Sequence, residues 1–200
     1  MKRFLAFAFA LALTAAIPAF AVEETSAWTI DPAHSSSQFS IRHLVISTVR
    51  GQFGKTTGTV KLDEKDLTRS SVEATVDVNT IDTRVAARDA DLKSPNFFDA
   101  ARYPTMTFKS NKVEKAGEDK LRVSGDLTIH GTTKPTVWDV TYSPQAKGMM
   151  GETRRGFAAS TRINRKDFGL TYSKAIEVGP VVGDEVAITI DAEAIKDQPK

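Results

Sequence analysis

The sequence predicts an all-β protein, an antiparallel up-and-down barrel of about eight strands, from three observations. Polar and apolar residues alternate with a period of two through most of the chain after Trp28, which is typical of half-buried strands. Clusters of turn-forming residues separate the alternating runs at short intervals, and short connections favour antiparallel neighbours. No long helical pattern lies between the runs. A β-sandwich shares these features, and we prefer the barrel.

The first 21 residues predict a cleaved secretory signal peptide. Lys2-Arg3 precedes an apolar run over residues 4–17, and Ala19-Phe20-Ala21 fits an A-x-A cleavage site. The run of about 14 apolar residues is shorter than the roughly 20 that a membrane-spanning helix needs. We therefore expect residues 22–200 to form one secreted domain.

The predicted strands follow one another along the mature chain. The clearest alternating runs cover residues 37–42, 72–78, 121–129, 157–163 and 186–194. The turn signals between strands are Gly51, Gly54, Gly58, residues 63–66, residues 116–119, His130-Gly131, residues 148–151 and Gly183-Asp184. Most of these connections have the length of a hairpin loop, which supports a meander.

One segment departs from the period of two. A helix is predicted over roughly residues 83–93, with Asp82 as its N-cap and Ser94-Pro95 as its end. The aromatic residues that follow, among them Phe97, indicate that the excursion packs on apolar surface. Beside a barrel, it would act as a lid or a plug.

Composition excludes several function classes. The chain has no cysteine and three histidines, which rules out disulfides, thiolate metal sites and a cysteine nucleophile. Without residues 1–21 it has equal numbers of basic and acidic residues, so no basic excess points to a nucleic-acid partner. The cluster of Arg154, Arg155, Arg162, Arg165 and Lys166 fits a solvated strand face.

The predicted interior is apolar. At the predicted inward positions, large residues alternate with small ones, and the small ones are Ala74, Gly125, Ala159 and Ala187. Phe accounts for 11 residues, and Phe offers apolar area without a polar handle. An eight-stranded barrel either fills with side chains or leaves room for one ligand, and the residues alone leave both interpretations open.

Nine short motifs follow one another along the chain. They are Trp28-Thr-Ile-Asp31-Pro-Ala-His34-Ser35, Phe39-Ser-Ile-Arg42-His43-Leu44, Gly51-Gln-Phe53, Ile81-Asp82-Thr83, Arg88-Asp89 with Leu92, Phe97-Phe98-Asp99, Tyr103-Pro104, Leu127-Thr-Ile-His130-Gly131-Thr-Thr-Lys134-Pro135 and Ile163-Asn164-Arg165-Lys-Asp-Phe168-Gly169. In this order and spacing they resemble the YceI-like family of secreted lipid-binding proteins. The resemblance covers about residues 28–194. Thr132 and Asn79-Thr80 depart from the family's usual residues.

The resemblance implies a lipocalin-like barrel that holds a long-chain isoprenoid lipid or a similar amphiphile, without catalysis and without a cofactor. It also implies a periplasmic location and a homodimer, and transient membrane contact would accompany lipid exchange. Burying a CH₂ group contributes roughly 0.8 kcal/mol, so a ten-carbon tail gains about 8 kcal/mol, which association costs of roughly 4–15 kcal/mol can cancel. We therefore expect a chain of about twenty carbons or more.

The predicted binding residues form two groups. The lipid tube is assigned to Phe39, Ile41, Phe53, Val76, Phe97, Phe98, Phe108, Leu127, Phe157, Ile163 and Phe168. The candidate head-group contacts are Arg42, His43, Arg88 and Asp89, and the segment 83–103 is expected to gate the tube.

Alternative functions remain at this point. The first is an interaction module with a filled core, and the second is a metal-dependent hydrolase. His34, His43 and His130 lack the spacing of a metal site. Residues 35–37 offer serines near His34, but no G-x-S-x-G elbow is present. We assign no catalytic and no metal residues.

Overall fold

The computed structural model describes residues 25–176 and 179–198, so the predicted signal peptide lies outside the described residues. The strands are β1 (Thr25–Ile30), β2 (Ser36–His43), β3 (Ser47–Phe53), β4 (Thr56–Asp63), β5 (Ser71–Asp77), β6 (Ile81–Asp82), β7 (Thr105–Lys115), β8 (Lys120–Ile129), β9 (Thr132–Tyr142), β10 (Ala146–Lys147), β11 (Thr153–Asn164), β12 (Ala175–Ile176), β13 (Gly179–Pro180) and β14 (Val182–Lys196). The helices are α1 (Ala86–Lys93) and the short 3-10 helices η1 (Pro32–His34), η2 (Leu67–Arg69), η3 (Val78–Thr80) and η4 (Arg165–Phe168). In this part of the chain, no helix has the length and hydrophobicity to cross a membrane.

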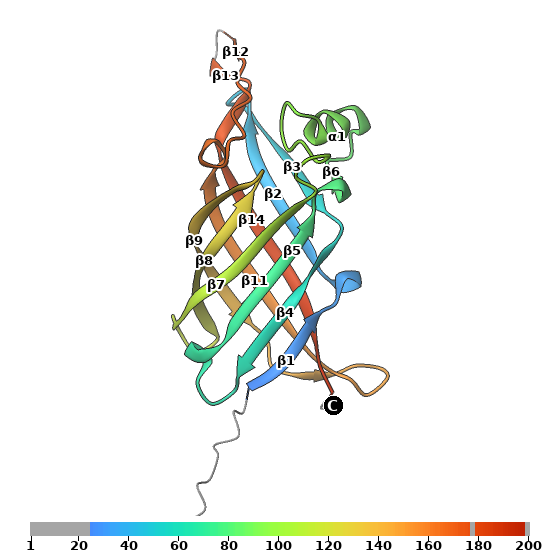
Figure 1. The fold of residues 1–200 in the computed structure, drawn as a ribbon, viewed down its shortest axis with the longest axis vertical. Coiled ribbons are helices and arrows are strands. Elements are labelled where there is room, and N and C mark those ends of the chain that lie inside the picture. Colours follow the sequence, from blue (N-terminus) through green and yellow to red (C-terminus); the bar gives the residue numbers. More distant parts are fainter. Residues whose placement is uncertain (1–24, 177–178, 199–200) are drawn as a thin grey trace, which may run out of the picture.

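Eight antiparallel strands close into a barrel (Figure 1). Hydrogen-bonded neighbours follow the order β11, β9, β8, β7, β5, β4, β1 and β14, and pairing of β14 with β11 completes the ring. The long pairing of β11 with β14 runs from Arg154 to Asn164 on one strand and from Ile195 to Glu185 on the other. The predicted all-β barrel is therefore confirmed.

The first two strands share one edge of β14. β1 pairs with its last residues, around Ala194, and β2 pairs with the stretch from Val182 to Asp191. Pro32 interrupts the strand at η1, because proline cannot donate to a sheet ladder and favours the start of a helix. β4 then continues beside β1 and β3 beside β2. The turn of the β2–β3 hairpin lies at the end of the barrel that is uppermost in Figure 1.

The helical excursion lies at that same end, next to β3 and β6 (Figure 1). Helix α1 begins later than predicted, and its N-cap is Val85, which makes no side-chain capping bond. Asp82 is not the cap, because its carboxylate accepts the Arg84 N–H at 2.7 Å and closes a turn before the helix. The end at Ser94 agrees with the prediction.

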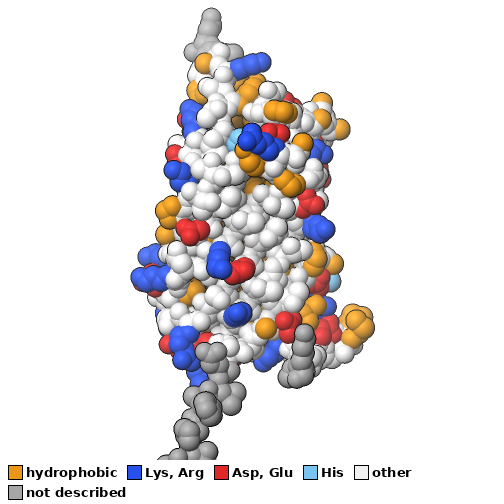
Figure 2. All heavy atoms as spheres, viewed as in Figure 1, with side chains coloured by type: hydrophobic (Ala, Val, Ile, Leu, Met, Phe, Trp, Pro, Cys, Tyr) orange, Lys and Arg blue, Asp and Glu red, His pale blue; other side chains and the backbone are white. Residues whose placement is uncertain are grey.

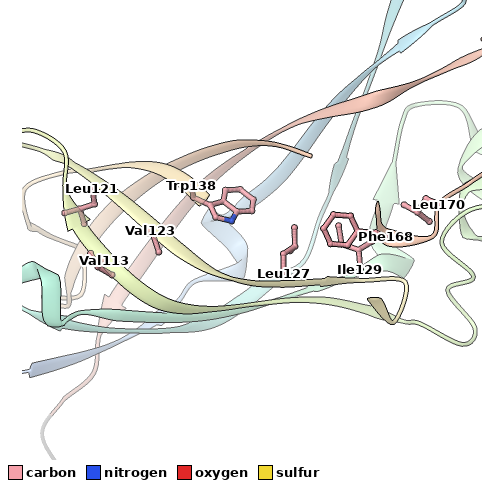
Figure 3. Packing of buried hydrophobic residues seen from close by; sticks show 8 residues of the cluster. All are labelled: Val113, Leu121, Val123, Leu127, Ile129, Trp138, Phe168 and Leu170. Atoms are coloured by element: carbon pink, nitrogen blue, oxygen red, sulfur yellow. The ribbon is translucent and has the colours of Figure 1, made fainter. Parts of the chain in front are cut away.

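The two ends of the barrel differ. A buried cluster of Trp28, Val60, Leu62 and Ala194 fills the end at which β1 begins and β4 ends. A second cluster extends along the barrel wall from Val113 and Leu121 toward Leu170 (Figure 3). Charged side chains of both signs are scattered over the outside, and hydrophobic side chains gather near α1 in this view (Figure 2).

Candidate functional site

The barrel encloses an apolar cavity of about 420 Å³. Inward positions of the strands line it, including Ala159 of β11 and Ile188 and Ile190 of β14. These three residues are only partly buried, although they point into a closed barrel. Side chains that fill a core at normal density would be buried on all sides, so the partial exposure reflects an open interior.

The structure places most of the predicted tube residues around this cavity. Those that line it are Phe39, Ile41, Phe53, Val76, Phe97, Phe98, Phe108, Leu127, Phe157 and Ile163. Phe168 is not among them, because η4 turns it into the wall cluster beside Ile129 and Leu170 (Figure 3), where it is 2% exposed. The sequence also predicts that Ala187 faces inward, and this prediction is wrong. Its neighbours Val186 and Ile188 on β14 line the cavity, so Ala187 points to the opposite face of the strand.

Aromatic side chains contact one another across the lining. The rings of Phe39 and Phe53 are 5.7 Å apart, and Phe53 meets Phe98 edge-on at 5.8 Å. Phe108 meets Trp138 in the same way at 5.8 Å. A Cβ on Gly125 would lie 2.6 Å from the Phe108 ring, so the glycine makes room for that ring. Such tilted contacts fix the wall without supplying polar groups.

The cavity opens at the α1 end. Arg42 and Asp91 line it and are also exposed to solvent. The ring of Phe97 stacks on Tyr172 with centroids 4.6 Å apart, which joins the loop after α1 to the segment after η4. The Leu44 N–H donates to the Val181 carbonyl at 3.0 Å and ties the β2–β3 turn to the same segment.

Three of the four predicted head-group residues lie at this mouth. Arg42, His43 and Arg88 line the cavity. Arg88 donates from Nε to the Thr83 hydroxyl at 2.7 Å and from Nη2 to the Thr83 carbonyl at 2.8 Å. Within the described chain, the His43 imidazole has no hydrogen-bond partner, so its ring nitrogens are free for a ligand.

Asp89 is a correction to the predicted site. It does not line the cavity. Its Oδ1 instead accepts the Thr83 N–H at 2.9 Å and the Thr83 hydroxyl at 2.5 Å. The carboxylate therefore holds the turn that leads into α1, which is why it turns away from the mouth.

The predicted site omits many lining residues, and three of them bear on its chemistry. Trp138 of β9, Tyr172 and Arg165 all border the cavity. Trp138 lies in a run whose polar residues hide the alternation, and Tyr172 lies outside any regular strand. Arg165 is buried, and its guanidinium donates to the Gly183 and Leu170 carbonyls and to Asp184. Because its guanidinium bonds to these protein groups, Arg165 stabilises the segments that form the mouth.

Arg155 closes the opposite end, although the sequence suggested a solvated cation. It is 9% exposed, lies 5.7 Å from the ring centroids of both Trp28 and Tyr142, and pairs with Glu64 at 3.2 Å. Arg155 lies two residues before Phe157 on β11 and faces inward with it, so the alternation of the strand could have predicted its position. The contacts of its guanidinium with the two aromatic rings help to close this end of the barrel.

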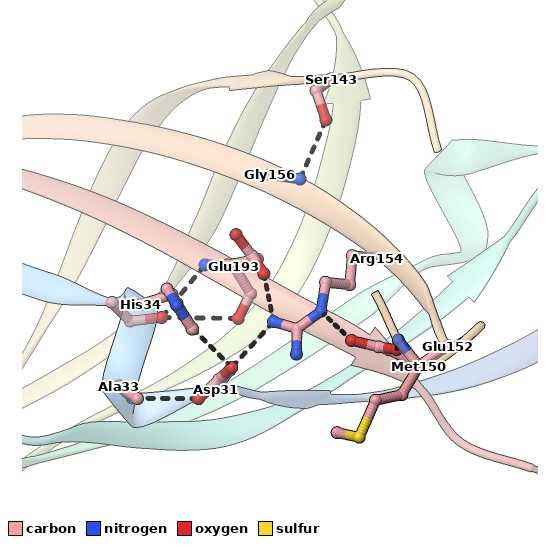
Figure 4. A network of polar contacts seen from close by, with 10 residues as sticks. Asp31, Ala33, His34, Ser143, Met150, Glu152, Arg154, Gly156 and Glu193 are labelled. Carbon is pink, nitrogen blue, oxygen red and sulfur yellow. Dashed lines mark hydrogen bonds and ion pairs between the residues drawn. The ribbon is translucent and has the colours of Figure 1, made fainter. Parts of the chain in front are cut away.

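A polar network lies on the outside of the barrel near η1 (Figure 4). Asp31, His34 and Glu193 form the one group of three candidate metal ligands within 4.8 Å in the described residues. Arg154 already occupies its centre, donating to Asp31 at 2.9 Å and to Glu193. Hydrogen bonds from His34, from the Ala33 N–H and from Arg154 lower the pKa of Asp31 to about 2. The arrangement is that of an ion-pair network around an arginine.

The serines raised by the hydrolase alternative are engaged elsewhere. The Ser35 hydroxyl lies 3.4 Å from the Glu193 carbonyl and accepts the Glu193 N–H at 3.0 Å. The Ser37 hydroxyl shares a 2.9 Å hydrogen bond with Thr56. Neither serine hydrogen-bonds to a histidine within the described chain.

These features define a class of protein. A closed eight-stranded barrel with one apolar cavity, sealed at one end and polar at the other, is the architecture of barrels that hold a single small ligand. The chain belongs to the YceI-like domain family, whose model matches residues 28–194. A UPF0312 protein of Vibrio cholerae is 41% identical over 138 residues, which cover 69% of this chain and 73% of the relative.

Solved structures share the fold. BcnA of Burkholderia cenocepacia superposes with a TM-score of 0.71 at 25% identity, over 82% of this chain and 98% of that one. A polyisoprenoid binding domain from Saccharophagus degradans superposes with a TM-score of 0.62 at 14% identity, over 86% of this chain and 99% of that one. The second likeness concerns the fold alone.

Proposed function

We propose that this protein is a secreted, non-catalytic binding protein that holds a long-chain isoprenoid lipid, or a similar amphiphile, inside its barrel. The observation that carries the proposal is the apolar cavity of about 420 Å³, enclosed by inward-facing Phe and aliphatic side chains. This volume lies within the roughly 300–1,000 Å³ of small-molecule sites. The binding of a polyisoprenoid by a domain of the same fold supports the choice of ligand class.

Partition drives the proposed binding. A hydrocarbon chain leaves water or a membrane for a space lined by residues such as Phe39, Phe157 and Ile188. The gain grows by roughly 0.8 kcal/mol for each buried CH₂, whereas the cost of association is paid once. Long chains are therefore bound and short ones are not.

The polar end of the ligand belongs at the mouth. The free ring nitrogens of His43 and the guanidinium of Arg88 border the cavity there, and the hydroxyl of Tyr172 has no hydrogen-bond partner in the described part of the chain. Together they offer hydrogen-bond donors to an oxygen-bearing head group. Asp89 is left out of this assignment because Thr83 engages it.

The proposal also includes where the protein acts and how it assembles. The predicted signal peptide supports secretion, with the periplasm as the compartment, and carriage of a lipid between membranes or proteins is the role that fits such a compartment. The homodimer implied by the family remains a prediction.

A chain-length series tests the proposal. Protein stripped of lipid is titrated with prenyl alcohols of ten, twenty and more carbons, and binding is followed by quenching of the lining residue Trp138. We expect no measurable binding of the shortest alcohol and clear, saturable binding of the longer ones. Equal binding of all lengths, or of none, would contradict the proposal.

A further inference from the structure

Three exposed apolar side chains lie on the two segments that border the mouth of the cavity. Ile46 is 77% exposed, and Val45, its neighbour in the β2–β3 turn, is also exposed. Val85, directly before α1, is 46% exposed. The turn follows the lining residues Arg42 and His43, and Val85 precedes the lining residue Arg88. These apolar tips therefore belong to segments that border the opening.

The local backbone gives no reason for apolar residues at these positions. Val45 has a φ of 64°, a conformation that is rare for a β-branched residue. Val85 occupies the N-cap of α1, where Ser, Thr, Asp or Asn would satisfy a free N–H and Val does not. Both positions thus hold an apolar side chain in water at the expense of local stability, which is typical of a surface with an external role.

Unpaired cations accompany the apolar tips. Arg42 donates to the Thr48 hydroxyl and to the Val45 carbonyl, both uncharged. Among the described residues, Arg84 and Lys93 have no side-chain partner. The neighbouring carboxylates Asp82 and Asp91 accept hydrogen bonds from uncharged groups, the Arg84 N–H and the Asn96 amide, and form no ion pair with Arg84 or Lys93 within the described residues. The cationic groups of Arg42, Arg84 and Lys93 are therefore available to an external anion.

We propose that the mouth end of the barrel docks on an anionic lipid bilayer. The docking surface consists of Val45, Ile46 and Val85, with Arg42, Arg84 and Lys93 beside them. Apolar tips that enter the interface and cations that meet lipid phosphates are the two attractions that hold peripheral proteins on anionic membranes. The inference deepens the proposed function and rests on it, because docking at the mouth would let a lipid pass between bilayer and barrel without crossing water.

Vesicle sedimentation with matched variants tests the surface. The mature protein, starting at Val22, is mixed with vesicles of phosphatidylcholine and phosphatidylglycerol, and with vesicles of phosphatidylcholine alone. The mouth variant combines Ile46→Asp with Val85→Asp. The control combines Val137→Asp with Met149→Asp, two exposed apolar residues on β9 and in the β10–β11 connection, away from the mouth.

We expect the wild type and the control to bind the anionic vesicles equally and the neutral ones weakly, and the mouth variant to lose at least about tenfold in affinity. Circular dichroism must show that both variants fold. Docking is overturned if the wild type ignores anionic vesicles, if the mouth variant binds as well as the wild type, or if the control loses as much. It is also overturned if light scattering shows that the mouth variant instead breaks a dimer.

Native mass spectrometry of the same samples separates this inference from the proposed function. If the protein carries a lipid but does not bind vesicles, only the proposed docking surface is contradicted. Protein that binds vesicles but takes up no lipid contradicts only the proposed cavity function.

Discussion

Phe39 and Ser40 are adjacent on β2 and point to opposite faces of the strand. Phe39 lines the cavity and contacts Phe53, whereas Ser40 is not a lining residue and pairs in register with Arg50 of β3. The same substitution at these two positions therefore separates an effect on the cavity from an effect on the strand.

Phe39→Asp should abolish lipid binding, because it places a charge in an apolar space where no partner can compensate it. Ser40→Asp should bind like the wild type, since its carboxylate faces solvent and Arg50. Lipid recovered by organic extraction from each folded variant is the measurement. Full recovery from Phe39→Asp would count against its place in the lining. If that variant does not fold, Phe39→Ala, which should weaken binding, replaces it.

The lowered pKa of a single residue, Asp31, predicts that the stability of the fold depends on pH. Its pKa is lowered to about 2, first by the hydrogen bond from His34, and the pKa in an unfolded chain is about 3.9. The contribution to stability is thus complete above about pH 5 and is lost as the pH falls toward 2. We expect a loss of about 1 kcal/mol in the free energy of unfolding. This is less than the full pKa shift of Asp31 implies, because solvent screens its ion pairs.

Urea unfolding between pH 7 and pH 3 measures this effect. The wild type should lose stability on acidification, and Asp31→Asn should be less stable at neutral pH and lose less below pH 5. Parallel curves for the two proteins would show that Asp31 is not a source of the acid sensitivity.

At the scale of elements, the mouth is held by contacts between segments that are far apart in the chain. The loop after α1 reaches the segment after η4 through the stack of Phe97 on Tyr172. Helix α1 itself has no buried residue, so few contacts oppose its movement. We therefore predict that the segment 83–103 opens the cavity by separating this stack while the barrel stays closed.

Tyr172→Ala should speed the exchange of bound lipid several-fold, because it removes the stack. Tyr172→Phe keeps the ring and loses only the hydroxyl assigned to the head group, so its exchange should be much slower than that of Tyr172→Ala and only slightly faster than the wild-type exchange. The cost to stability should be small, about 1 kcal/mol for the lost aromatic pair. Transfer of a fluorescent prenyl probe from protein to vesicles, followed in time, gives both rates. Equal rates for wild type and Tyr172→Ala would show that the stack does not control access.

At the scale of the whole molecule, the barrel combines a sealed end with an open one. Arg155 and the cluster around Trp28 seal the first, and the opening beside α1 lies at the second. Under the proposed function, we predict that a lipid enters and leaves at the open end, with its chain directed toward the sealed end. An interaction module with a filled core is disfavoured, because partly exposed residues such as Ala159 surround open space.

Much of this architecture could be predicted from the sequence, because a period of two reports directly on which side chains share a face. The runs around Phe39, Leu127 and Phe157 have that period and line the cavity as expected. The errors have physical causes. Asp82 and Asp89 are short polar residues that fit several turn geometries, and the sequence does not distinguish a helix cap from a turn or a head-group contact.

The remaining parts of the site depend on contacts that no local pattern encodes. Phe168 follows an alternating strand, but η4 ends the period before it. Tyr172 belongs to the mouth only because the chain returns there to meet Phe97. Whether the interior of the barrel is filled or open depends on the summed volumes of inward side chains, which residues alone do not fix.

Native mass spectrometry of the mature protein purified without detergent, followed by extraction and identification of what it releases, tests the proposed lipid binding most directly. We expect one long-chain isoprenoid or comparable amphiphile per barrel. A protein that is empty as purified, and that stays empty after incubation with prenyl lipids, would show that the barrel is not a lipid-binding site.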